Sequence, residues 1–189
     1  MGMGEPFLNY NAVINASKLL NDENGIGLGA RRITISTVGI IPKIVQFTKE
    51  EHRFKLAISL NGSTQEQRLQ TMPIAKKFPI QSLMDSAKNY YKQRRRFLTF
   101  EYVLMGGIND DVMDAENLIH LIGSLPCKVN VIPYNEIDGE YKRPSNNRIS
   151  RFIDILKIAP FTVTVRWSNG TEIDAGCGQL VVNTGGVQS

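Results

Sequence analysis

The sequence predicts an α/β fold in which parallel strands are joined by crossover helices. Segments rich in β-branched and aromatic residues alternate along the chain with segments whose apolar residues recur at helical spacing. The length of 189 residues and the hydrophobic fraction of 42% suit one compact domain with its own core. Such alternation predicts parallel strands, and it leaves two architectures open: a doubly wound sheet, and a complete or partial barrel.

The individual elements follow from short patterns. Apolar residues at helical spacing follow Asn9 and Asn11, either of which suits an N-cap, and Pro42 suits the first turn of a helix. The expected helices lie at 12–20, from Pro42 onward, in two stretches that end near Arg94, around 118–122 and at 149–156. The expected strands, rich in Ile, Val, Thr and Phe, cover 32–37, 54–60, 97–105, 128–135 and 161–167.

Composition narrows the class of protein. The net charge of +4 and the pI of about 9.1 make the chain mildly basic, which permits a nucleic-acid partner without requiring one. Two cysteines, Cys127 and Cys177, are too few for a disulfide scaffold and suit a reducing compartment. The sequence has neither a run of about 18 apolar residues nor a secretory signal. We therefore expect a cytoplasmic protein with no membrane partner.

Polar residues gather where the predicted strands end. In both architectures chemistry collects at the carboxyl ends of the strands. The opening loop and the strand ends supply Gly4, Glu5, Ser36, Thr37, Ser59, Asn61 and Asn135. Such a ring can hold a zwitterionic or hydroxyl-rich small molecule by hydrogen bonds. Because Ser, Thr and Asn also begin turns everywhere, the ligand site and the ordinary turns both remain open at this point.

Two further motifs could indicate a functional site, and only one of them is retained. The glycines of residues 25–30, GIGLGA, match a dinucleotide-binding fingerprint, but the segment follows a helix and leads into a strand, so the fingerprint is rejected. Cys177 lies between two glycines, which let a large substrate come close, whereas Cys127 precedes an apolar strand. Cys177 is therefore the candidate reactive thiol.

Six stretches together resemble one known family. MGMGEPFLNY, ARRITISTVGI, AISLNGS, TFEYVLMGGIND, LPCKVNVIPYN and IDAGCGQL occur in the order found in the radical SAM adenine methyltransferases of the RlmN/Cfr type. The resemblance covers almost the entire chain. It implies a partial parallel (β/α) barrel of the radical SAM type, truncated at its N-terminal side. Residues 1–189 would then form one radical SAM core fragment that ends in a catalytic-cysteine segment.

The resemblance also implies an activity. Members of this family methylate an adenine ring carbon, with carbon 2 expected here, in 23S ribosomal RNA and in transfer RNA. They use S-adenosyl-L-methionine (SAM), a 4Fe–4S cluster and an electron donor, and we expect a monomer. Cys177 would be the cysteine that is methylated and then carries the carbon to the RNA. The residues that would bind SAM are Gly4, Glu5, Ser36, Ser59, Leu60, Asn61 and Asn135.

The chain departs from the family pattern at two places. Asn61 stands where most relatives carry His, and Asn keeps one hydrogen-bond donor and one acceptor. The CxxxCxxC motif that ligates the cluster is absent, so no metal ligands are expected in this chain. We therefore expect the chain alone to be inactive. The alternatives are a non-catalytic remnant that binds SAM or RNA, and an inert scaffold without a ligand.

Overall fold

The computed structural model describes residues 4–136 and 141–167, so Cys177 lies outside the described residues. Its helices are α1 Tyr10–Asn21, α2 Ile41–Lys49, α3 Gln65–Thr71, α4 Ile80–Arg94, α5 Val112–Ile122 and α6 Asn146–Leu156. Its strands are β1 Thr34–Thr37, β2 Lys55–Ser59, β3 Leu98–Leu104, β4 Cys127–Pro133 and β5 Thr162–Val165. Within these residues, no helix is long and apolar enough to cross a membrane.

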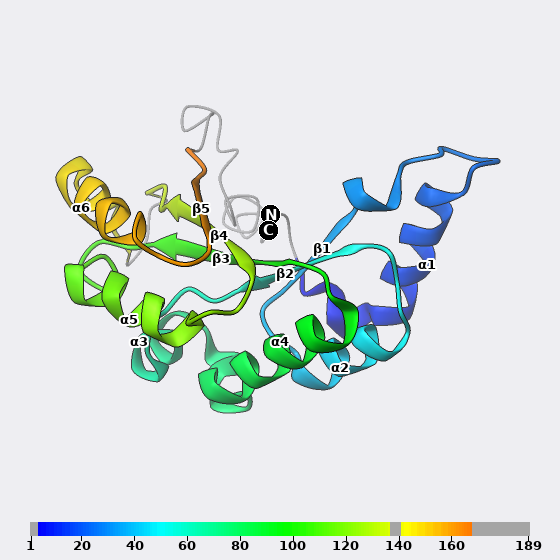
Figure 1. Ribbon diagram of the computed structural model, residues 1–189, viewed down its shortest axis with the longest axis horizontal. Coiled ribbons are helices and arrows are strands. Elements are labelled where there is room, and N and C mark those ends of the chain that lie inside the picture. Colours follow the sequence, from blue (N-terminus) through cyan, green and yellow to red (C-terminus); the bar gives the residue numbers. More distant parts are fainter. Residues whose placement is uncertain (1–3, 137–140, 168–189) are drawn as a thin grey trace, which may run out of the picture.

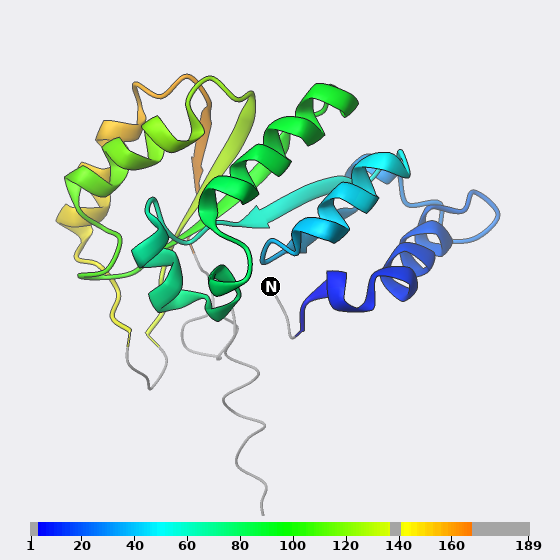
Figure 2. The ribbon, with the colours of Figure 1, turned by 90° about the horizontal axis from the view of Figure 1, so that it is seen from below.

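The strand order decides between the two predicted architectures. The five described strands form one sheet in the order β1-β2-β3-β4-β5, and all four ladders are parallel. A doubly wound sheet reverses its strand order at a central crevice, and this sheet does not. Helices α2 to α6 lie along the outer side of the curved sheet (Figures 1 and 2). The expected partial parallel barrel is therefore confirmed.

The register gives the sheet two different faces. Ile58, Phe100, Val129 and Val163 pair in one row, which packs into the hydrophobic core with the helices. The next row along the strands consists of polar side chains: Ser59, Glu101, Asn130 and Thr164. Because alternate residues of a strand point to opposite faces, this polar row lies on the face away from the helices.

The expected start of the first strand was wrong. The strand expected at 32–37 begins at Thr34, because residues Ala30–Arg32 form a 3-10 turn in which Arg32 N–H donates to the Gly29 carbonyl. Asn9, one of the two expected candidates, does occupy the N-cap position of α1, although its side chain makes no capping hydrogen bond. Complete capping boxes instead begin α3, with Thr64 as the N-cap, and α5, with Asp111 as the N-cap.

Candidate ligand site at the carboxyl ends of the strands

Hydrogen bonds to the Glu5 side chain hold the opening loop against the end of β1. Gly4 has a φ of +85°, a backbone conformation that glycine adopts without strain. The Glu5 carboxylate accepts hydrogen bonds from Thr37 Oγ1 at 2.6 Å, Val38 N at 2.7 Å and Phe7 N at 3.0 Å. A carboxylate offers about four acceptor positions, so Glu5 keeps capacity for one more donor, such as an ammonium group.

Ser36 lies on the polar face and is held by a buried acid. Its Oγ donates to Glu101 Oε2 at 3.3 Å across β2, on which Ala57 pairs with Ser36 and Ser59 pairs with Glu101. Burial raises the pKa of Glu101, although the hydrogen bond from Ser36 and the charge of Arg166 act in the opposite direction. Glu101 also pairs in register with Ser59. Two predicted site residues, Ser36 and Ser59, therefore adjoin a carboxyl group that is costly to ionise.

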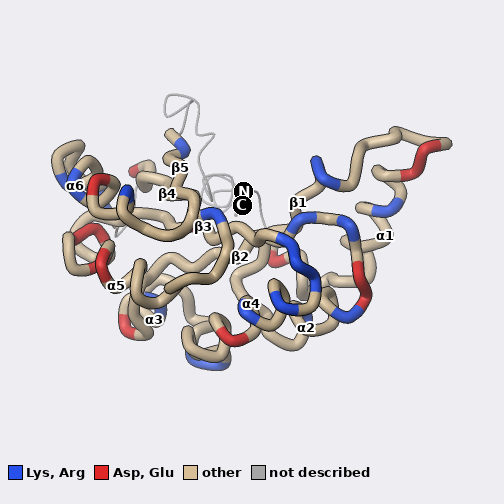
Figure 3. Tube along the Cα trace, in the orientation of Figure 1, with Lys and Arg blue, Asp and Glu red and all other residues tan. Residues whose placement is uncertain are grey.

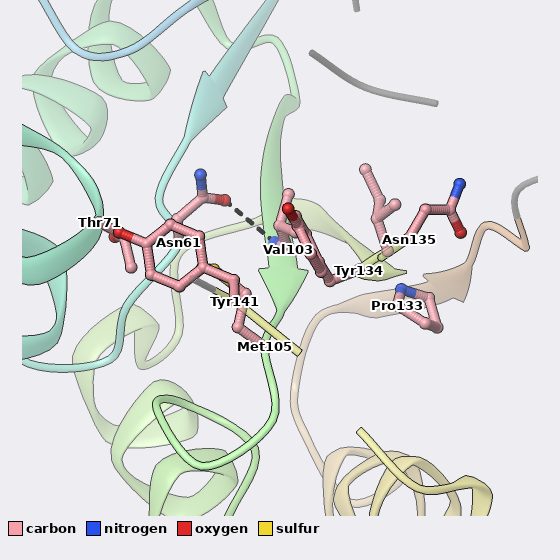
Figure 4. Close-up of a pocket in the computed structure, with 9 residues that line it drawn as sticks. Asn61, Thr71, Val103, Met105, Pro133, Tyr134, Asn135 and Tyr141 are labelled. Carbon is pink, nitrogen blue, oxygen red and sulfur yellow. Dashed lines mark hydrogen bonds between the residues drawn. The ribbon is translucent and has the colours of Figure 1, made fainter. Parts of the chain in front are cut away.

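A cavity brings two other predicted residues together. Asn61 and Asn135 both line a cavity of about 170 Å³ at the ends of β2, β3 and β4 (Figure 4). Its other lining residues are mostly apolar or aromatic: Thr71, Val103, Met105, Ile132, Pro133, Tyr134 and Tyr141. Asn61 has a φ of +52°, and its Oδ1 accepts from Val103 N at 3.0 Å, which ties the end of β2 to β3.

Arg68 of α3 links the ends of β1 and β2 by hydrogen bonds to backbone carbonyls. It is fully buried, and its Nη1 donates to the carbonyls of Ser59 at 2.8 Å and Leu60 at 2.6 Å. Its Nη2 donates to the carbonyl of Val38. Burial lowers the pKa of Arg68 to about 10, so the guanidinium still carries its charge near neutral pH. The Leu60 side chain is itself fully buried, and its backbone N–H donates to the Glu101 carbonyl.

The predicted site residues thus separate into groups. Glu5 and Ser36 lie at or beside the end of β1, Ser59 lies on the polar face, and Asn61 and Asn135 share the cavity. Four residues in these groups were not predicted from the sequence: Glu101, Arg68, Tyr134 and Tyr141.

The thiol that the structure describes does not suit an iron–sulfur cluster. Cys127 begins β4, is 4% exposed, and burial raises its pKa to about 12. Cluster ligands are thiolates, so a buried protonated thiol is a poor candidate. Within residues 4–136 and 141–167, no group of three or more His, Cys, Asp or Glu side chains could hold a metal ion. The residues that the structure describes therefore do not fit a 4Fe–4S cluster.

Solved structures define the class of protein. A radical SAM methyltransferase from Sphaerobacter thermophilus is similar with a TM-score of 0.91 and 42% identity, over 95% of this chain and 53% of that one. A domain of a pyruvate-formate lyase-activating enzyme from Bacteroides vulgatus matches with a TM-score of 0.60 and 17% identity, over 88% of this chain and 96% of that one, and supports the fold alone. The chain has the fold of the radical SAM proteins.

Curated relatives give the family. No family model matches the chain. The chain is 46% identical over 185 residues to a probable dual-specificity RNA methyltransferase RlmN 3 of Opitutus terrae, covering 97% of this chain and 50% of that protein. It is 44% identical over 186 residues to the dual-specificity RNA methyltransferase RlmN of Psychrobacter arcticus, covering 96% and 45%. The chain belongs to the RlmN family and spans about half the length of the curated relatives it matches.

Proposed function

We propose that this chain is the SAM-binding part of an RNA methyltransferase that modifies an adenine ring carbon, carbon 2, in 23S ribosomal RNA and in transfer RNA. The observation that carries the proposal is the cavity at the strand ends, which Asn61 and Asn135 line in a chain 44–46% identical to proteins named as RNA methyltransferases. The radical SAM fold of a structural relative at 42% identity supports SAM as the methyl donor.

The chain's own residues divide the proposed binding task. Glu5 has acceptor capacity left for the ammonium group of the methionine part. The cavity of about 170 Å³ is smaller than the range of about 300–1,000 Å³ usual for whole ligands, so it suits the planar adenine end alone. Ser36 and Ser59 supply hydroxyls from the polar face. SAM, when bound, supplies an electrophilic methyl group.

Cys177 is the proposed acceptor of that methyl group. A thiolate would form the new S–C bond while the sulfonium carbon–sulfur bond breaks and S-adenosylhomocysteine leaves. Transfer onto the RNA carbon requires the cluster, for which the described residues supply no ligands, so no step through it is assigned to this chain. The same observation favours a second candidate, a module that binds SAM or RNA without catalysis.

Calorimetry with SAM tests the proposal. We expect the 189-residue chain to release or absorb heat on binding SAM, and we expect Glu5→Ala to abolish this signal. Glu23→Ala, which removes an exposed acid from the loop after α1, is the matched control and should bind SAM normally. No heat with the unmodified chain would contradict the proposed site. Mapping modified nucleotides by mass spectrometry, in cells with and without the gene, tests the choice of carbon 2 and of both RNAs.

A further inference from the structure

The proposed SAM site does not use an exposed indole that Arg143 links to residues of the cavity. Trp167, directly after β5 and Arg166, is 53% exposed. An indole so exposed gains little from apolar burial in this chain. The guanidinium of Arg143 lies over it, with Cζ 5.9 Å from the ring centroid, which is within the range of a cation–π contact.

Arg143 joins Trp167 to the cavity. Its Nη1 donates to the Tyr134 carbonyl and to Asn135 Oδ1, both at 3.5 Å. The Tyr134 ring packs edge-on against Tyr141, with centroids 6.2 Å apart and planes at 82°. Both tyrosines line the cavity. Tyr141, Tyr134, Arg143 and Trp167 thus form a continuous row, here named the aromatic rim, that leads from the cavity to the surface.

Among the described residues, cations outnumber acids around the aromatic rim. Lys142 and Arg166 are exposed and join Arg143. Glu136 accepts a hydrogen bond from Arg143 N at 3.2 Å, and Glu101 interacts with the charge of Arg166. The backbone holds these groups in place: Gly106 N donates to the Lys142 carbonyl at 2.8 Å, and Arg166 N donates to the Val131 carbonyl at 2.9 Å. Among the described residues, three cations face these two acids, of which Glu101 has a raised pKa, and this excess of cations suits a ligand that bears phosphates.

We propose that the aromatic rim binds single-stranded RNA, with an unpaired base stacked on Trp167 and the neighbouring phosphates near Arg143, Lys142 and Arg166. Aromatic faces and arginine planes hold bases that have left the helical stack, and a duplex does not offer such bases. The inference rests on the proposed function, because chemistry on an adenine carbon requires a base outside the stack. The inference also names the residues that would bind the RNA strand next to the modified adenine.

Trp167 is the single tryptophan of the chain, so its fluorescence reports the contact directly. We expect an adenine-rich single-stranded RNA to quench this fluorescence saturably and the same strand in a duplex to quench it much less. In anisotropy measurements with the labelled strand, Trp167→Ala should raise Kd roughly tenfold, as loss of one stacked base does. Trp167→Phe, which keeps an aromatic face, should restore most of the affinity.

A matched control lies at the amino end of the strands, whereas Trp167 follows the carboxyl end of β5. Phe97 precedes β3, is 69% exposed and follows Arg95 and Arg96, and cations also gather around the end of α4 (Figure 3). Phe97→Ala should leave Kd unchanged. An equal loss in both alanine variants, equal quenching by duplex, or no RNA binding by the chain would overturn the inference. The heat of SAM binding does not involve Trp167, so it judges the proposed function separately.

Discussion

Replacing Arg68 by Met should destabilise the fold by about 3 kcal/mol. The substitution removes a hydrogen bond to Met72 Sδ and three to carbonyls, so the carbonyls of Val38, Ser59 and Leu60 lose a charged donor. Each such loss costs about 1–3 kcal/mol in a buried position. Part of this loss in stability is offset because the variant no longer buries a cation. The variant also lacks the buried Arg68 Nε, which has no acceptor among the described residues.

Urea unfolding followed by circular dichroism measures this difference. For a domain of this size, about 3 kcal/mol corresponds to a fall in Tm of roughly 6–12 °C. Arg151→Met, which removes an exposed arginine from α6, is the control and should change the free energy of unfolding by less than about 0.5 kcal/mol. Arg68→Lys should recover little, because one ammonium group cannot reach carbonyls on both strands as the planar guanidinium does. If the free energy of unfolding of Arg68→Met lies within about 1 kcal/mol of that of the unmodified chain, the hydrogen bonds of Arg68 do not stabilise the strand ends.

Two further predictions concern titrating groups. Because burial raises the folded-state pKa of Glu101, the folded state binds its proton more tightly than the unfolded state, and stability falls as pH rises through that pKa. Glu101→Gln should therefore gain stability relative to the unmodified chain as the pH rises above the ordinary pKa of a glutamate, and a pH-independent difference in urea unfolding would contradict this. Cys127, with its pKa raised to about 12, should react with iodoacetamide only on unfolding, whereas Cys177 should react in the native chain. Peptide mass mapping shows the order, and faster labelling of Cys127 would refute it.

The sequence predicted the order of the elements because each had a local cause. Runs of β-branched residues marked the strands, and Pro42 marked the start of α2, which begins at Ile41. The boundary at Thr34 was missed because the hydrogen bonds of the preceding turn, such as Arg32 N–H to the Gly29 carbonyl, are not visible in composition. Such boundaries depend on the backbone path.

Site residues that directly follow a strand were predicted from the sequence. Residues that act through hydrogen bonds to distant segments were missed. Arg68 lies in a polar helix, and its acceptors are carbonyls of other segments, so the sequence offered no sign of its burial. Glu101 did leave a signal. Thr99 and Glu101 alternate with the apolar residues of β3, which places them on the opposite face. Asn61 and Asn135 were predicted as site residues, and the cavity that they share is a tertiary feature.

The sequential strand order also bears on how the chain folds. Each ladder of the five described strands joins a strand to the next strand along the chain, so the paired strands are separated by one crossover helix or, between β2 and β3, by α3 and α4. Short sequence separations lower the loop-closure entropy of each step and favour fast folding for a parallel sheet. A nascent chain could therefore complete each strand pair soon after the second strand leaves the ribosome. The central strands of a doubly wound sheet, in contrast, gain their last neighbours from distant parts of the chain.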